Sequence, residues 1–292
     1  MKNKKIIAVI FAVMAAGLYA ISMPISKLLL NKIDPTLLAA LLYLGAGSGI
    51  GVLKLFNKKN NTSEKISKND LPYVIGMVVL DIIAPILLMI GLKNSLSTNA
   101  SLLNNFEIVC TSLIALIIFK EYISRKMWIA IILITISSFV LSIDLTSSFT
   151  FSWGSLLILL ATLAWGFENN CTRNLADKDT YVIVIIKGLF SGLGSLIVSL
   201  ILKENIPYFI YILCALLLGF IAYGLSIFFY IKAQGKIGAS KTSAYYSLAP
   251  FIGTFLSFIL LGEKLSFTYY IGLLIMIIGT AIVVKDTLQK GD

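Results

Sequence analysis

The sequence predicts an all-α integral membrane protein with ten transmembrane helices in two inverted five-helix repeats. Three observations lead to this fold class: the composition, the long apolar runs and an internal repeat. Of the 292 residues, 58% are hydrophobic and only 13% are charged. Soluble domains have about 45–50% apolar and about 25% charged residues. A water-soluble globule cannot bury this much apolar surface, so the predicted solvent is a lipid bilayer.

Ten apolar runs are long enough to cross a bilayer, which takes about 20 residues. The expected spans are residues 6–30, 35–56, 71–92, 97–119, 126–144, 152–175, 180–202, 207–231, 238–261 and 266–284. The connections between them are short and polar, and none has room for a soluble domain. The first run is too long for the apolar region of a signal peptide and lacks a clear cleavage site, so we expect it to be a span.

The distribution of basic residues predicts the orientation. An even number of spans places both termini on one side of the membrane. If that side is the cytoplasm, its loops and termini hold 18 of the 24 Lys and Arg residues, and the outer loops hold 5. The positive-inside rule therefore predicts a multi-pass protein of the cell membrane with cytoplasmic termini. The net charge of +10 is explained by this topology, and we expect no nucleic-acid partner.

The second half of the chain repeats the first. Residues 100–144 align without a gap on residues 242–286, which places Glu121 on Glu263, 142 positions later. We therefore expect one five-helix repeat over residues 1–145 and another over residues 146–292. Five is an odd number, so the second repeat crosses the membrane in the opposite sense. Inverted repeats permit alternating access, although a duplication could also simply enlarge a helix bundle.

Four ionisable residues lie deep within the expected spans, where a charge costs about 2.5–3.5 kcal/mol. They are Asp81, Glu107, Glu168 and Lys187. Counting residues along the helices predicts that Glu168 and Lys187 lie at one depth and could pair, either as a structural ion pair or as one that changes during transport. Glu107 has no cation nearby in sequence, so it is the first candidate for binding a proton or a cation. Asp81 is the second.

Neutral polar and aromatic residues on the same helix faces are further candidates for binding a substrate or an ion. These candidates are Asn104, Trp165, Asn169, Asn170, Tyr223, Thr242 and Tyr245. Hydrogen bonding between helices is the alternative role for the neutral ones. Three prolines within spans, Pro24, Pro85 and Pro250, are candidate helix breaks beside a cavity.

Other residue types exclude chemistry or indicate packing. The chain has no histidine, and Cys110, Cys171 and Cys214 are far apart, so we expect no catalytic residues, no metal site and no cofactor. Glycines cluster within residues 35–56 and 180–202. Small residues allow helices to approach closely, so both expected spans are predicted to pack tightly against neighbours.

Several stretches resemble a known family over essentially the whole chain. They are LLNNFEIVCTSLIALIIFKE, AWGFENNCTRNLADKD and IAYGLSIFFYIKAQGKIGASKTSAYYSLAPFIG. With the duplicated five-helix plan, they resemble the EamA-type permeases of the drug/metabolite transporter superfamily. The resemblance implies ten helices, cytoplasmic termini and movement of small metabolites, often outward. The chain departs from the pattern at Glu168, where many relatives have Asp, and Pro250 has no partner in the first repeat, where Ile108 stands.

The function predicted from these features is secondary transport of a small metabolite, such as an amino acid or an organic cation, as an exporter working by alternating access. Proton antiport and facilitated diffusion both fit, and no phosphate-binding loop for ATP is found. The expected partners are the substrate and the bilayer, and the protein is expected to be a monomer or a homodimer. Two alternatives are a lipid-linked sugar flippase and, less favoured without histidine, an intramembrane lipid-modifying enzyme.

Overall fold

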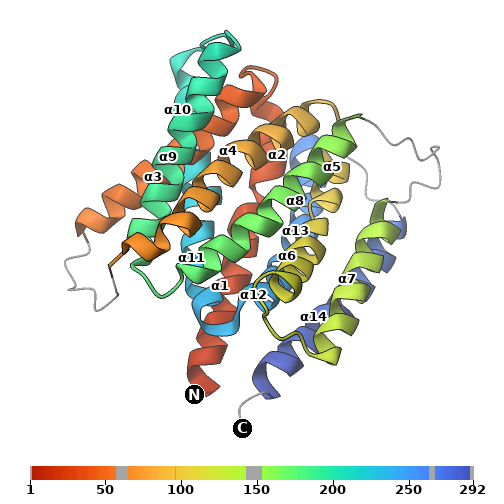
Figure 1. The fold of residues 1–292 in the computed structure, drawn as a ribbon. Helices are drawn as coiled ribbons and strands as arrows, with labels where there is room; N and C mark the ends of the chain where they lie inside the picture. Colours follow the sequence, from red (N-terminus) through yellow and green to blue (C-terminus); the bar gives the residue numbers. More distant parts are fainter. Residues whose placement is uncertain (1, 57–64, 96, 143–152, 263–266, 290–292) are drawn as a thin grey trace.

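The computed structural model describes residues 2–56, 65–95, 97–142, 153–262 and 267–289, and these ranges form helices and connecting turns without any strand (Figure 1). In the first half, the elements are α1 (Lys2–Ala20), α2 (Ser22–Leu29), α3 (Pro35–Phe56), the 3-10 turn η1 (Lys68–Asp70), α4 (Leu71–Lys93), α5 (Ser97–Leu103), α6 (Phe106–Ile117) and α7 (Arg125–Ser142). In the second half, they are α8 (Trp153–Asn174), α9 (Thr180–Ile201), α10 (Phe209–Leu218), the π-helical segment η2 (Gly219–Leu225), α11 (Ser226–Ile237), α12 (Ala239–Tyr246), α13 (Ala249–Leu261) and α14 (Phe267–Gln289). The all-α prediction is confirmed.

Seven helical segments of the described chain are long and apolar enough to cross a membrane. Several of these segments contain two or more consecutive elements, for example α1 and α2, or α10, η2 and α11. The seven segments are Lys5–Leu29, Pro35–Phe56, Lys68–Lys93, Thr180–Ile201, Phe209–Ile237, Ala239–Leu261 and Tyr270–Thr287. The chain is therefore a multi-pass membrane protein.

The expected count of ten spans is not confirmed at three places. The expected span 97–119 is divided at Asn104–Asn105 into the short helices α5 and α6. The expected span 126–144 runs beyond the described residues, since residues 143–152 lie outside them. Helix α8 has 22 residues, but its last two turns carry Glu168, three Asn residues and Arg173, which lower its mean hydropathy.

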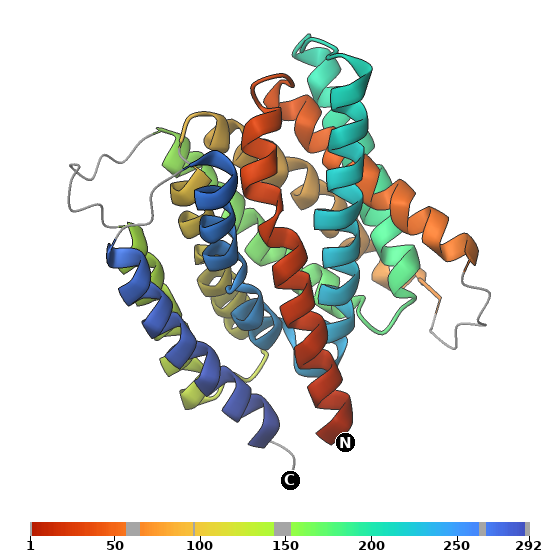
Figure 2. The same ribbon diagram turned by 180° about the vertical axis from the view of Figure 1, so that it is seen from behind.

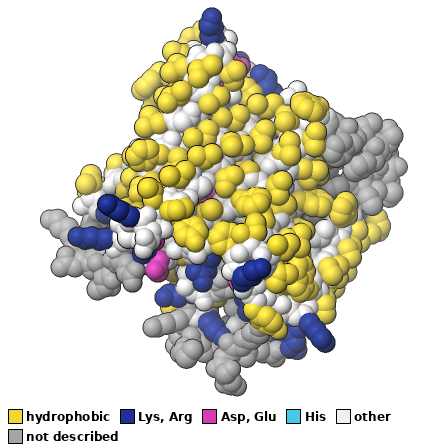
Figure 3. Space-filling view, viewed as in Figure 1, with side chains coloured by type: hydrophobic (Ala, Val, Ile, Leu, Met, Phe, Trp, Pro, Cys, Tyr) yellow, Lys and Arg dark blue, Asp and Glu magenta, His cyan; other side chains and the backbone are white. Residues whose placement is uncertain are grey.

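The outer surface fits a bilayer. Large apolar side chains such as Leu55, Ile197, Leu200 and Phe209 are more than half exposed. Figure 3 shows apolar side chains over most of one face, with Lys and Arg gathered mainly at one end. This pattern is typical of a protein whose middle is surrounded by lipid and whose ends reach water.

The two halves of the chain are interleaved rather than separate. The N- and C-termini lie at the same end of the molecule (Figures 1 and 2). The most extensive helix packing joins α3 to α9, α4 to α8, and α7 to α14, so each pair takes one helix from each half. Figure 2 shows α7 and α14 side by side at the edge of the bundle.

Helices α3 and α9 approach so closely that their backbones touch. A Cβ atom on Gly188 would lie 2.3 Å from the amide nitrogen of Gly47 and 2.4 Å from its Cα atom. Lys54 at one end of α3 forms an ion pair with Asp179, the N-cap of α9, at 3.1 Å. At the other end, Glu204 accepts hydrogen bonds from the backbone N–H groups of Thr36 and Leu37 at 3.1 and 2.7 Å. The packing predicted from the clustered glycines is confirmed for this pair.

Both halves contain a helix broken at an aligned position. The break at Asn104–Asn105 between α5 and α6 aligns with the break at Ser247–Leu248 between α12 and α13, to within one residue, under the offset of 142. Beyond the second helix of each pair, Lys120 and Gly262 also align, and both have positive φ angles, 56° and 68°. Glu121 follows Lys120 and lies beside the N-terminus of α12, where its Oε2 accepts a 3.4 Å hydrogen bond from the N–H of Ala239. Its aligned residue, Glu263, lies outside the described residues.

Candidate functional site

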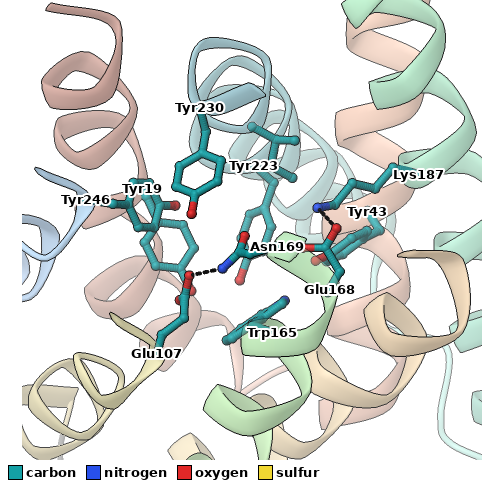
Figure 4. Close-up of a pocket in the computed structure, with 11 residues that line it drawn as sticks. Tyr19, Tyr43, Glu107, Trp165, Glu168, Asn169, Lys187, Tyr223, Tyr230 and Tyr246 are labelled. Carbon is teal, nitrogen blue, oxygen red and sulfur yellow. Dashed lines mark hydrogen bonds and ion pairs between the residues drawn. The ribbon is translucent and has the colours of Figure 1, made fainter. Parts of the chain in front are cut away.

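A cavity lies in the middle of the helix bundle, between helices from both halves of the chain (Figure 4). The cavity volume that the centres of water molecules can occupy is about 40 Å³, so the cavity has room for a few waters. The cavity is lined by Tyr19, Tyr43, Glu107, Trp165, Glu168, Asn169, Lys187, Tyr223, Ile227, Tyr230 and Tyr246. Such a narrow space cannot take a metabolite until some of these side chains move.

One side of the cavity is an ion cluster centred on Lys187. The Lys187 Nζ atom lies 2.8 Å from Glu168 Oε1 and 3.1 Å from Asp81 Oδ2. Asp81 is fully buried behind the cavity wall, where its Oδ1 accepts hydrogen bonds from the Tyr43 hydroxyl at 2.8 Å and the Trp165 Nε1–H at 3.2 Å. Glu168 also accepts a hydrogen bond from Thr172, one turn along α8. Both carboxylates are thus supplied with donors, as buried charges require.

Glu107 lies on the opposite side of the cavity from Lys187 (Figure 4). It is in the first turn of α6, where the helix dipole favours a negative charge. Its Oε1 accepts a 2.7 Å hydrogen bond from Asn169 Nδ2, and the same amide contacts Thr111 Oγ1 at 3.2 Å. No ion pair to Glu107 is present among the described residues. Glu107 is therefore a buried carboxylate without a cation partner.

Aromatic rings form much of the remaining wall. The ring of Tyr19 lies 5.2 Å from that of Tyr246 and 5.5 Å from that of Tyr223, measured between centroids. Tyr246 in turn lies 5.0 Å from Tyr230, and Tyr43 lies 5.4 Å from Tyr223. These contacts are in the range of favourable aromatic pairs. Two of the five rings come from α1 and α3 in the first half, and three come from η2, α11 and α12 in the second half. The aromatic wall therefore joins both halves of the chain.

A smaller side cavity adjoins the first one at Glu107. It lies where the break between α5 and α6 meets the break between α12 and α13, and its lining includes Asn104, Tyr246 and Pro250. Asn104 is 4% exposed, and its Oδ1 atom has no hydrogen-bond partner in the structure. An unpaired acceptor beside a cavity can be satisfied by a donor that enters it.

The structure brings together most of the residues predicted from sequence. Glu107, Trp165, Glu168, Asn169, Lys187 and Tyr223 line the central cavity, Asp81 lies behind it, and Asn104 lines the side cavity. Glu168 and Lys187 form the pair that helix depth allowed. Asn170 lies elsewhere, with its Nδ2 donating to the backbone oxygens of Thr111 and Gly166 at 3.0 and 2.9 Å.

Two further predicted residues, besides Asn170, lie away from the cavities. Tyr245 is fully buried in an apolar cluster with Ile108 and Met127, and the adjacent Tyr246 lines the cavity instead. Thr242 is also fully buried, and its hydroxyl donates to the Gly238 carbonyl within α12 at 2.7 Å. For Tyr245 the reason is geometric, because adjacent helical residues point about 100° apart, whereas Thr242 shares the face of Tyr246 but lies one turn earlier in α12.

The three prolines differ in their effect on the helices. Pro24 lies in the first turn of α2, just after the interruption at Ile21, and Pro250 is the second residue of α13. Both positions tolerate a residue without an N–H group. Pro85 lies inside α4, which continues through it. It cannot donate to the carbonyl of Asp81, one turn earlier, so the proline removes a helical hydrogen bond beside the ion cluster.

Sequence reasoning did not select four tyrosines that line the cavity: Tyr19, Tyr43, Tyr230 and Tyr246. A signal for one of them is present in the repeat, because Leu18-Tyr19-Ala20 aligns with Ala164-Trp165-Gly166. Tyr19 and Trp165 are therefore aligned residues that both line the cavity. Tyr230 and Tyr246 also give a signal, because they lie on the same polar helix stripes as the candidates Tyr223 and Thr242. Tyr43 gives no comparable signal, since tyrosines are common in helix cores.

The arrangement offers groups that can bind small charged or polar molecules. No group of three or more His, Cys, Asp or Glu side chains in the described part of the chain is placed to hold a metal ion. The site offers one carboxylate without a cation, a neutralised ion cluster, amide groups and several aromatic faces. A ligand in it would be surrounded by helices of both halves.

The chain is similar to proteins that are named as transporters. The sequence profile of the EamA-like transporter family matches residues 6–143 and, separately, residues 152–285. The chain is 27% identical over 291 residues to an "Uncharacterized transporter" of Methanothermobacter thermautotrophicus, which covers 90% of this chain and 82% of that protein. It is 24% identical over 248 residues to "Uncharacterized transporter YyaM" of Bacillus subtilis, which covers 80% of each.

The fold also occurs in a solved crystal structure. The two align with a TM-score of 0.79 over 98% of each chain, at 15% sequence identity. At this identity the similarity shows a shared fold. The family profile spans nearly the whole sequence. The helices of the protein surround a charged central cavity. The chain belongs to the EamA-like transporter family, and it is a membrane transporter.

Proposed function

We propose that this protein is a secondary transporter that exports a small metabolite across the cell membrane by alternating access, coupled to protons through Glu107. The observation that carries the proposal is a buried carboxylate without a cation partner, in a cavity lined by both halves of a transporter-family chain. No phosphate-binding loop for ATP is found in the sequence, which favours an ion gradient over ATP as the direct energy source.

Glu107 suits proton coupling because its charge can change without leaving other groups unpaired. Asp81 and Glu168 both form ion pairs with Lys187. Glu107 depends only on the Asn169 amide, which can donate to a carboxylate or to the carbonyl oxygen of a carboxylic acid. The ionisable groups that face it are Tyr19 of α1, Glu168 of α8, Lys187 of α9, Tyr230 of α11 and Tyr246 of α12.

Flux measurements in proteoliposomes test this role. A screen of metabolites by thermal stabilisation of the purified protein first identifies a ligand, because a ligand that binds the folded state raises its apparent stability. In wild-type vesicles, we expect a pH gradient to drive accumulation of that ligand. Glu107→Gln keeps the shape of the side chain and its acceptor for Asn169, so the variant should fold but lose pH-driven flux.

Asp177→Asn is the matched control, because it also replaces a carboxylate by an amide and the Asp177 side chain is 61% exposed at the end of α8. It should keep pH-driven flux. Undiminished proton-driven flux in Glu107→Gln would remove Glu107 from the coupling step. If no compound in the screen gives flux or cavity-dependent stabilisation, the proposed function itself is wrong.

A further inference from the structure

The charges around the central cavity are unequal. Lys187 is the only basic residue among the eleven that line it, and two carboxylates share its ammonium group. Glu107 adds a third carboxylate on the opposite side. When all of these groups are ionised, the cluster carries two more negative than positive charges.

An excess of negative charge in the middle of a membrane is costly unless a cation compensates it. A proton supplies one positive charge without filling space. A larger cation supplies the same charge and also fills the cavity. The site therefore favours cationic ligands over anionic ones on charge alone.

Aromatic rings stand next to the carboxylate that lacks a partner. Figure 4 shows Tyr19 and Tyr246 beside Glu107, with Tyr230 above them. Faces of tyrosine rings attract cations within about 6 Å of the ring centroid. The same rings offer apolar area to the alkyl part of an organic ion, which a metal ion or a bare proton would not use.

Asn104 adds an acceptor close to the same carboxylate. It lines the side cavity together with Glu107, and its buried Oδ1 atom has no hydrogen-bond partner. An ion with N–H groups can donate to both a carboxylate and an amide oxygen. An ion without N–H groups, such as a quaternary ammonium, would leave Asn104 unsatisfied.

We infer that the transported molecule is an organic ammonium ion whose protonated amine binds Glu107 and Asn104 while its alkyl part contacts Tyr19 and Tyr246. This inference rests on the proposed function and specifies its substrate. A zwitterionic amino acid fits less well, because its carboxylate needs a cation and Lys187 is already bonded to Asp81 and Glu168. The substrate is thus an amine without an acidic group.

Four probes of similar size test the inference by thermal stabilisation of the full-length protein in detergent. They are n-butylammonium, butan-1-ol, which lacks the charge, norvaline, which adds a carboxylate, and tetramethylammonium, which lacks N–H groups. We expect n-butylammonium to stabilise the protein at lower concentrations than the other three. In Glu107→Gln, its apparent affinity should fall about 10- to 100-fold, as expected for loss of a charge-assisted hydrogen bond. Asp177→Asn should bind as the wild type does.

Two further substitutions keep the test decisive if Glu107→Gln folds poorly. Asn104→Leu retains the side-chain volume but removes the acceptor, so affinity for n-butylammonium should fall about tenfold. Tyr19→Phe retains the ring and should bind nearly as well as the wild type, whereas Tyr19→Leu removes the ring and should bind less tightly.

The outcomes separate this inference from the proposed function. Equal or better stabilisation by norvaline or butan-1-ol overturns the ammonium assignment, and so does n-butylammonium binding that Glu107→Gln leaves unchanged. If n-butylammonium fails while an anion or a zwitterion from the metabolite screen is transported, the protein is a transporter and only its substrate class is wrong.

Discussion

At the scale of single residues, the distinctive feature is one lysine shared by two buried acids. Lys187 lies 2.8 Å from Glu168 and 3.1 Å from Asp81, and all three side chains are nearly inaccessible to solvent. Removing the cation leaves two buried carboxylates without a counter-charge, whereas removing one acid leaves a normal pair. The three positions are therefore not equivalent.

Lys187→Met should lower the stability of the protein strongly, by about 3–5 kcal/mol, because breaking a buried ion pair leaves an uncompensated charge. Adding Glu168→Gln should restore only part of the loss, since Asp81 still lacks its cation. Adding Asp81→Asn as well should restore more. Thermal unfolding of the single, double and triple variants measures the coupling. Purely additive changes would contradict the shared ion cluster, and Asp177→Asn, far from it, should show no coupling.

The ion cluster also shows how much of the residue pairing could be predicted from the sequence. Residue counting along spans 152–175 and 180–202 placed Glu168 and Lys187 at one depth, and the structure pairs them. Asp81 was expected to be a separate candidate, and its bond to Lys187 was missed. Depth along a helix can be counted from sequence, but which helices are neighbours cannot. Only the packing of α4 against both α8 and α9 brings Asp81 to the same lysine.

At the scale of helices, the most extensive packing in the bundle is between α3 and α9, and their backbones touch. Gly47 and Gly188 meet backbone to backbone, and the carbonyl oxygen of Tyr43 would lie 2.8 Å from a Cβ atom on Gly188. Tyr43 and Lys187 both line the cavity, and Lys187 directly precedes Gly188 in sequence. The distance between these two helices therefore sets one wall of the site.

Gly188→Ala should separate the two helices, because the new methyl group would meet backbone atoms that cannot rotate away. The expected cost is about 1–3 kcal/mol, as for other overpacked positions. Gly51→Ala in α3 is the matched control, since nothing lies within 4 Å of its added Cβ atom. This control should be neutral or stabilising by up to about 1 kcal/mol, because alanine favours helices over glycine. Equal unfolding temperatures for both variants would show that the close contact does not limit packing.

Helix interruptions limit what the sequence predicts at this scale. Hydrophobic runs predicted the long helices well, as for α3, α4 and α9. The run over residues 97–119 gave no sign of a break, although Asn104 and Asn105 stand where α5 ends and α6 begins. Asparagine disfavours helix interiors only weakly, so tertiary packing decides whether the chain breaks there. Because that break was missed, so was the side cavity it creates.

At the scale of the whole molecule, charge predicts how the protein sits in the membrane. Both termini lie at one end, together with the turn that carries Asp177 (Figure 1). Asn205, in the exposed loop between α9 and α10, belongs to the other end. The excess of basic residues predicts that the end with the termini faces the cytoplasm.

Cysteine labelling in intact cells tests this orientation. The background carries Cys110→Ala, Cys171→Ala and Cys214→Ala, since the native thiol of Cys214 is exposed. Asn205→Cys should then react with a membrane-impermeant maleimide added outside. Asp177→Cys should react only after the cells are permeabilised. The reverse pattern would show that the termini face outward and that the predicted orientation is wrong.

The contacts of α3 with α9 and the loop after it have a consequence for how the molecule can change shape. The two helices are joined at one end by Lys54 and Asp179, at the other by Glu204, and in the middle by Gly47 and Gly188. Contacts at three points favour movement of α3 and α9 as one unit, and this unit carries Tyr43 and Lys187. Glu107 lies on α6, which is not part of this unit and which is separated from α5 by the break at Asn104–Asn105. Movement of the outer helices relative to α3 and α9 would then change the distance between Glu107 and Lys187. This single distance would report how far the cavity has opened.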